Sequence, residues 1–84
     1  MEVTGDSNLI YDSGEASEAV AVLKAAGIDP EHFVFHVKRT PSSTISYAVS
    51  VTNRVTQRGA TLAGGPGANW VQDLKEKITT GELQ

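Results

Sequence analysis

The spacing of apolar residues changes along the chain from a helical period to a strand period. Between residues 13 and 26, apolar side chains recur three and four positions apart, which is the pattern of an amphipathic helix. The members of this stripe are mostly small: Ala16, Ala19, Val20, Leu23 and Ala26. Asp12 is a suitable N-cap, with Glu15 three residues later as in a capping box. Gly27 and Pro30 then predict the end of the helix.

After residue 32 the pattern has a period of two. In the first alternating segment, one face carries Phe33, Phe35 and Val37, and the other carries His32, Val34, His36 and Lys38. In the second segment, one face carries Ile45, Tyr47, Val49 and Val51, and the other carries Ser46, Ala48, Ser50 and Thr52. Residues 40–43, Thr-Pro-Ser-Ser, are typical of a turn. Two amphipathic strands joined by a short polar turn predict an antiparallel hairpin.

A weaker strand and a second helix are predicted in the last third of the chain. Residues 60–63 are typical of a third strand, and the turn before it lies either at 53–54 or at 57–59. The glycine-rich segment 64–67 interrupts the chain. A helix follows, opened by Pro66 at N1 or Asn69 as N-cap and closed by Gly81. Its apolar stripe is Trp70, Val71, Leu74 and Ile78.

These elements predict one small α+β domain spanning residues 1–84. The element order is α-β-β-(β)-α, and we expect an antiparallel sheet with both helices packed on one face. Residues 8–11 are compatible with a further short strand, and residues 1–8 are expected to be a flexible N-terminus.

Composition narrows the functional classes. Of the 84 residues, 39% are hydrophobic and 20% are charged, which is typical of a globular chain. The absence of cysteine excludes disulfides, thiolate metal sites and a cysteine nucleophile. The longest apolar run, 19–23, is far too short to span a membrane. We therefore expect a cytoplasmic protein, and because so small a domain buries little apolar surface, a homodimer or a protein partner would help to stabilise it.

Charge is segregated along the sequence. Residues 1–31 contain seven acidic residues and one lysine, whereas residues 32–72 contain four basic residues and no acid. The four basic residues are Lys38, Arg39, Arg54 and Arg58. They predict a basic patch near the hairpin ends, suited to an acidic protein partner or to nucleic acid.

The predicted order α-β-β-β-α resembles that of double-stranded RNA-binding domains. In that family, a lysine-rich run opens the last helix and contacts phosphates. Here the corresponding residues 65–70 contain no base, and Lys75 and Lys77 come later. The aromatic residues Phe33 and Phe35 also fall on the predicted core face. The resemblance therefore covers element order alone.

No motif predicts catalysis or a cofactor. His32 and His36 are separated by four residues, which on a strand is about 13 Å and too far for one metal ion. The glycine-rich segment 64–67 lacks the Lys-Ser/Thr of a phosphate-binding loop. Ser42, Ser43 and the strand serines have no acid nearby to complete a triad. We therefore expect no enzyme, no metal and no cofactor.

The leading hypothesis is a non-enzymatic protein-binding module: a regulator, adaptor or inhibitor. Small proteins without a catalytic motif are often accessory proteins of phages or mobile elements. The expected contact surface is the polar sheet face with the basic hairpin: Val34, His36, Lys38, Arg39, Ser46, Ala48, Ser50, Arg54 and Arg58. The alternative is a nucleic-acid-binding module that uses the basic segment 38–58.

Overall fold

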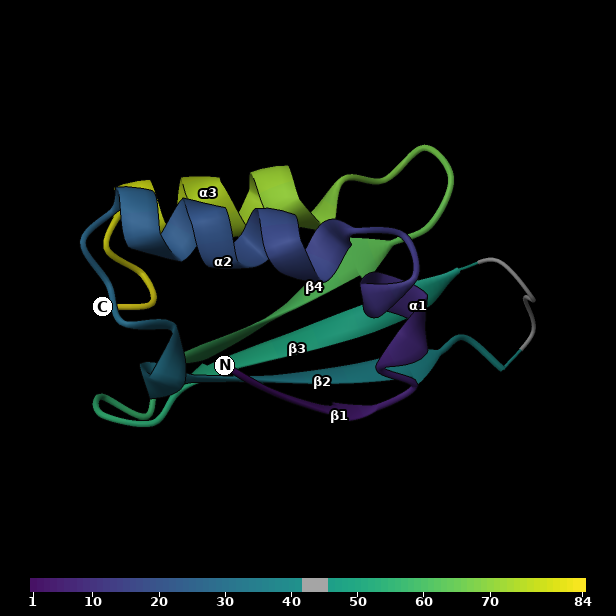
Figure 1. Ribbon diagram of the computed structural model, residues 1–84, viewed down its shortest axis with the longest axis horizontal. Helices are drawn as coiled ribbons and strands as arrows, with labels where there is room; N and C mark the ends of the chain where they lie inside the picture. Colours follow the sequence, from purple (N-terminus) through teal and green to yellow (C-terminus); the bar gives the residue numbers. More distant parts are fainter. Residues whose placement is uncertain (42–45) are drawn as a thin grey trace.

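Four strands form one mixed sheet in the order β1-β2-β3-β4 (Figure 1). The computed structural model describes residues 1–41 and 46–84. The strands are β1 (Glu2–Gly5), β2 (Phe33–Arg39), β3 (Tyr47–Asn53) and β4 (Gly59–Gly64). The β2–β3 and β3–β4 pairs are antiparallel, but β1 pairs parallel with β2, so the prediction of an antiparallel sheet is corrected to a mixed one. The third strand of the prediction is present as β4.

The N-terminal segment differs most from the prediction. Residues 1–8, which we expected to be a flexible terminus, contain β1, in register with β2 from Glu2–Val34 to Gly5–Val37. Residues 8–11 form a single helical turn, α1 (Asn8–Tyr11), and not a strand. In a helical turn the adjacent residues Leu9 and Ile10 can both turn toward the core, whereas strand alternation would point one of them away. Ile10 is fully buried.

The two longer helices are α2 (Glu15–Ala25) and α3 (Trp70–Thr79), and a short 3₁₀ turn, η1 (Pro30–His32), leads into β2. Asn69 caps α3, because its side chain accepts a hydrogen bond from the Gln72 N–H. Asp12 does not cap α2; it ends α1, and Gly14 occupies the N-cap position.

A Schellman motif ends α2. Gly27 has a φ of 74°, a backbone conformation that glycine adopts without strain. The Ile28 N–H donates to the Leu23 carbonyl, and the Gly27 N–H donates to the Lys24 carbonyl. The predicted end of this helix is therefore confirmed.

The turn between β3 and β4 is organised by Asn53. Its side-chain oxygen accepts from the N–H groups of Val55 and Thr56, and its side-chain nitrogen donates to the Leu83 carbonyl at 2.8 Å. The Asn53 N–H donates to the Arg58 carbonyl, so the turn spans 54–58 and includes parts of both predicted positions. Asn53 is buried, and its hydrogen bonds satisfy its polar atoms there.

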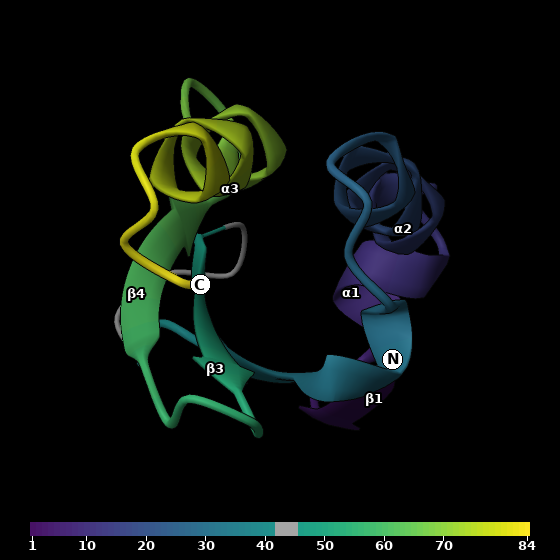
Figure 2. The same cartoon turned by 90° about the vertical axis from the view of Figure 1, so that its left-hand side faces the viewer.

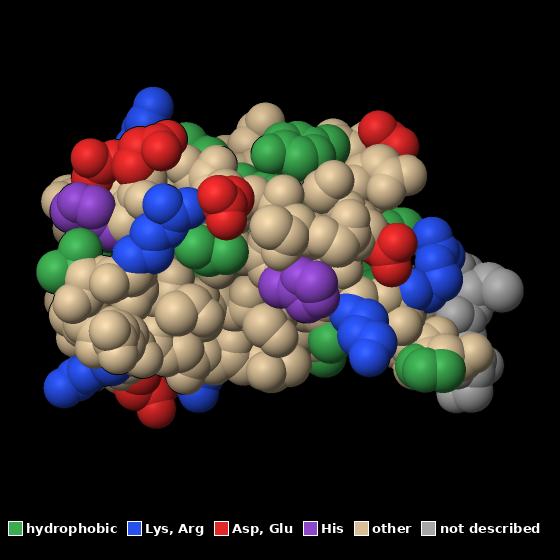
Figure 3. All heavy atoms as spheres, turned by 90° about the horizontal axis from the view of Figure 1, so that it is seen from below, with side chains coloured by type: hydrophobic (Ala, Val, Ile, Leu, Met, Phe, Trp, Pro, Cys, Tyr) green, Lys and Arg blue, Asp and Glu red, His purple; other side chains and the backbone are tan. Residues whose placement is uncertain are grey.

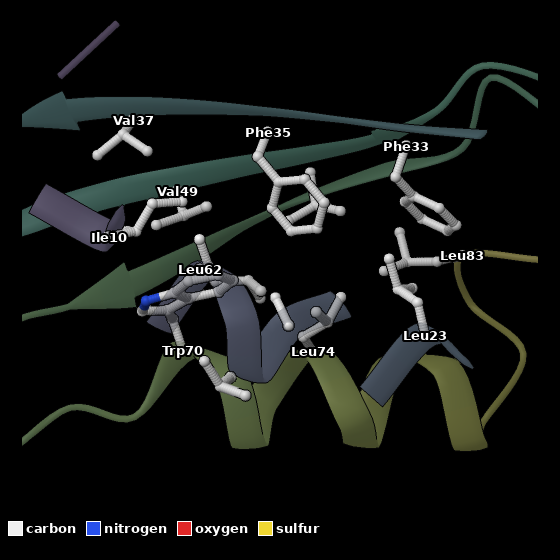
Figure 4. Close-up of a cluster of buried hydrophobic side chains, with 14 of the residues drawn as sticks. Ile10, Leu23, Phe33, Phe35, Val37, Val49, Leu62, Trp70, Leu74 and Leu83 are labelled. Atoms are coloured by element: carbon white, nitrogen blue, oxygen red, sulfur yellow. The ribbon is translucent and has the colours of Figure 1, made fainter. Parts of the chain in front are cut away.

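The core lies between the sheet and the helices. Figures 1 and 2 show α2 and α3 side by side above the sheet, with α3 over β4. The predicted inward faces are buried at Phe33, Phe35, Val37, Val49 and Val51. Trp70 packs edge-on against Phe35 at a centroid distance of 5.8 Å, and Leu23 and Leu83 fill the opposite end of the core (Figure 4). The predicted turn at 40–43 and the inward position of Ile45 fall wholly or partly outside the described residues.

Candidate functional site

One side of the sheet presents the alternate side chains that do not enter the core. We call this surface the open face: Glu2, Thr4, Val34, His36, Lys38, Ala48, Ser50, Thr52, Thr61 and Ala63. Figure 3 views the molecule from the side of the sheet away from α2 and α3, where backbone and polar atoms cover most of the surface and hydrophobic side chains form separate patches. The open face is therefore mostly polar.

A polar row crosses all four strands of the open face. The strand registers place Thr4 beside His36, His36 beside Ser50, and Ser50 beside Thr61. Thr4 Oγ1 and His36 Nδ1 are 2.8 Å apart, and the hydroxyl oxygens of Ser50 and Thr61 are 3.5 Å apart. The contact with Thr4 fixes the orientation of the imidazole ring and leaves Nε2 for another group. Sequence analysis identified His36 and Ser50 but missed Thr4, since β1 was not predicted.

The rows on either side have different chemistry. Toward the C-terminal end of β2, Lys38 lies beside Ala48, and Ala48 lies beside Ala63. Toward the other end, Val34 lies between Glu2 and Thr52. Ala48 is only partly exposed, so this row provides a shallow apolar strip beside one positive charge.

The four basic residues do not form one patch. Lys38 and Arg39 end β2, whereas Arg54 and Arg58 belong to the turn at the opposite end of the sheet. The six residue steps along β2 from Phe33 to Arg39 correspond to about 20 Å. Arg54 forms an ion pair with Glu2 at 3.3 Å, and the Arg58 guanidinium donates to the Gly81 carbonyl. Glu2 is a further charged residue of this surface that sequence analysis did not select.

Arg39 lies beside the open face and not on it, and Ser46 lies just before β3. Arg39 has the strand position of an inward residue, but it is exposed because it lies beyond the core. The Arg39 N–H donates to the Asp6 carboxylate at 3.1 Å. The Asp6 side chain thus continues the parallel pairing with β2 after β1 ends. Ser46 precedes β3, and its carbonyl accepts from the Thr40 N–H.

The two histidines lie in different elements. His32 is the last residue of η1 and His36 is in the middle of β2. Within residues 1–41 and 46–84, no three side chains of His, Asp or Glu are grouped so as to hold a metal ion.

A second polar cluster lies where α2, β3 and α3 meet. The Tyr47 hydroxyl donates a short hydrogen bond to the Glu15 carboxylate, which also accepts from the Ser13 hydroxyl. Burial raises the pKa of Tyr47 to about 12, and the contact with Glu15 acts in the same direction, while the Trp70 side chain and the Gly65 backbone act against it. The Trp70 indole N–H is buried and has no partner at hydrogen-bond geometry among the described residues.

The Tyr47 ring leaves room only for glycine at position 64. Tyr47 and Gly64 are directly opposite in the β3–β4 pair, and a Cβ on Gly64 would lie 2.2 Å from the Tyr47 ring. The ring therefore lies against the glycine backbone, in the manner by which aromatic side chains cover glycine in sheets.

Two shallow grooves lie on the helical side. One lies between α2 and α3 and is lined by small apolar residues with Lys75, Ile78 and Thr79. The other lies between α2 and η1 and includes Tyr11, Lys24 and Glu31. Neither contains a buried polar side chain that lacks a partner, so we place the candidate site on the open face.

No protein-family model matches this chain, and no curated protein or solved structure gives a significant match. In the described part of the chain, no helix combines the length and the apolar character needed to cross a membrane.

Proposed function

We propose that this chain is a non-enzymatic protein-binding module that acts as a regulator, adaptor or inhibitor by covering a partner's surface with its open face. The supporting observation is the composition of that face: short side chains across four strands, with a polar row through the middle. Such a surface allows close approach of a second protein, and its hydroxyl and imidazole groups offer both donors and acceptors.

The arrangement of charge favours a partner with acidic groups. Lys38 is an exposed cation on the open face, and Arg39, whose N–H donates to the Asp6 carboxylate, follows it at the end of β2. The charge at the opposite end is reduced, because Glu2 pairs with Arg54. An acidic group of the partner would therefore be placed at the Lys38 end, where it would mainly increase the association rate.

Nucleic-acid binding remains the alternative function, and it has less support. Arg54 and Arg58 make contacts within the chain and lie about 20 Å along the strands from Lys38. Phe33 and Phe35 are fully buried and cannot stack on bases. A duplex or single strand would thus meet few available cations.

A pair of matched variants tests the protein-binding proposal. Ala48→Arg places a long cation on the open face between Lys38 and Ala63, whereas Ala25→Arg makes the same change on the helical side, at the groove between α2 and α3. Each protein is immobilised and exposed to lysate of the source cell, and the retained proteins are compared by quantitative mass spectrometry. We expect a partner that is retained by the wild type and by Ala25→Arg and is depleted at least tenfold by Ala48→Arg.

Two results would contradict the proposal. Equal depletion by both variants would exclude a role specific to the open face. Tight binding of a defined duplex RNA or single-stranded DNA, measured by fluorescence polarisation and abolished by Lys38→Glu, would favour the nucleic-acid alternative. Circular dichroism of each variant establishes that the fold is retained.

A further inference from the structure

Among the described residues, the backbone groups at three positions on the outer edge of β4 have no partner. The Asn53 N–H donates to the Arg58 carbonyl, and hydrogen-bonded pairs alternate with non-bonded pairs in an antiparallel ladder. In the observed register, Ala60, Leu62 and Gly64 therefore direct their backbone groups toward β3. The intervening residues, Gly59, Thr61 and Ala63, direct theirs away from the sheet.

This edge has none of the features that usually protect an edge strand. No charged residue and no proline lies between Gly59 and Gly64, and the sheet ends at β4 without a further strand among the described residues. Natural edge strands are commonly blocked by charges, prolines or bulges, or are very short. β1, the other edge, has only four residues and carries Glu2.

From this edge we infer that β4 pairs with β4 of a second copy of the chain, antiparallel, about a twofold axis at Thr61. In this register Thr61 lies opposite Thr61 of the second copy, and Gly59 lies opposite Ala63. All three outward-directed residues then belong to hydrogen-bonded pairs, each of which exchanges two bonds. The edge is thus complementary to itself, as a twofold interface requires.

Two further observations favour a second copy over an unrelated peptide. The first is the polar row of the open face, which ends at Thr61 in one chain and would continue through the axis into the row of the other. The second is the charge on α3. Lys75 and Thr79 line the groove toward α2, so the opposite flank of α3 carries Asp73 and Lys77.

Because α3 lies over β4 (Figure 2), the twofold axis brings the two α3 helices together in antiparallel orientation. The flank of each helix would then bring Asp73 toward Lys77 of the second copy. Lys77 also pairs with Glu82 of its own chain at 3.2 Å, so Asp73 of the second copy would join an existing ion pair. No charge lies between residues 59 and 69, so no like charges oppose the approach of the two edges.

The axis at Thr61 gives a specific cross-linking test, because the chain contains no cysteine. A hydrogen-bonded antiparallel pair has a Cα separation of about 5.5 Å, which a disulfide can bridge. We expect Thr61→Cys to form a covalent dimer readily under mild oxidation. The matched control is Ala63→Cys, which is on the same strand and the same face, but whose two copies lie several residues apart in this register. It should cross-link at least tenfold more slowly.

The wild-type protein should also change its apparent mass with concentration. Light scattering after size exclusion, from micromolar to submillimolar protein, should show the mass rise to twice that of the single chain. Thr61→Lys places two cations beside the axis and should prevent this rise, whereas Ser50→Lys, one strand further in, should not. A monomer at every concentration, or a dimer in which Thr61→Cys and Ala63→Cys cross-link equally, would overturn the inference. A monomer that pairs β4 with an extended peptide would overturn it as well.

Discussion

Tyr47 shows how much of one residue's environment depends on distant parts of the chain. Strand alternation predicts its inward direction, and the structure confirms this direction. The alternation does not reveal that Glu15, at the start of α2, accepts its hydroxyl hydrogen or that Gly64 makes room for its ring. A partly buried hydroxyl needs a partner, and here the partner lies 32 residues away.

Tyr47 makes stability dependent on pH in the alkaline range. Its pKa rises from 10.0 to about 12 on folding, so its contribution is complete below pH 10 and is lost as the pH rises toward 12. We expect urea unfolding to show a steeper loss of stability across this window in the wild type than in Tyr47→Phe. Tyr11→Phe, at an exposed position, should retain the wild-type slope. Identical slopes in the wild type and Tyr47→Phe would contradict this assignment.

Gly64→Ala should destabilise the protein through the Tyr47 ring. The added Cβ cannot fit without displacing the ring, and overpacking of this kind costs about 1–3 kcal/mol. The free energy of unfolding in urea gives the cost directly. In a Tyr47→Ala background the same change should cost much less, because the ring is absent. Equal costs in the two backgrounds would mean that the backbone at Gly64 is the source of the effect.

Zinc should leave the melting temperature unchanged. His32 and His36 lie in different elements, and in the described residues no third ligand is grouped with them. Differential scanning fluorimetry with and without micromolar zinc tests this expectation. A rise of several degrees that His36→Ala abolishes would show that the two histidines bind metal together.

At the scale of elements, the sequence predicts those whose pattern repeats. β2, β3 and α3 each contain at least three inward residues at the expected spacing, and their positions agree with the prediction to within a few residues. β1 contains one apolar residue, Val3, so its position depends on pairing with β2 and not on a local pattern. The single turn of α1 is likewise too short for a helical period to be visible.

Docking of α3 depends on Trp70. Its side chain is fully buried and contacts Phe35, so Trp70→Ala should cost about 3–5 kcal/mol and unfold much of the protein at ambient temperature. Gln72→Ala, at an exposed position on the same helix, should change stability by less than about 0.5 kcal/mol. Thermal melts followed by circular dichroism compare the two. A Trp70→Ala melting point within a few degrees of wild type would mean that α3 is not held by this contact.

At the scale of the whole molecule, five of the selected site residues share the open face. Val34, His36, Lys38, Ala48 and Ser50 are brought together because strand alternation determines the direction of each side chain. The predicted hairpin already places Lys38 and Arg39 at its turn and Arg54 at its opposite end, so a single basic patch did not follow from the predicted pairing. Thr61 was also predictable, as an alternate position of the third strand, but the weak pattern there drew no attention to it.

The difference between the two edges of the sheet sets the size of any assembly built through β4. A twofold contact uses the long edge of both copies, so each end of the joined sheet is a copy of β1. That strand offers four residues and the charged Glu2, and the chain leaves the sheet at Asp6, whose N–H donates to the Val37 carbonyl. If β1 were as long and uncharged as β4, β1 of one pair could add to β1 of the next, and the domain would polymerise into a filament. In an assembly joined through β4, the shortness of β1 would therefore terminate growth at two chains.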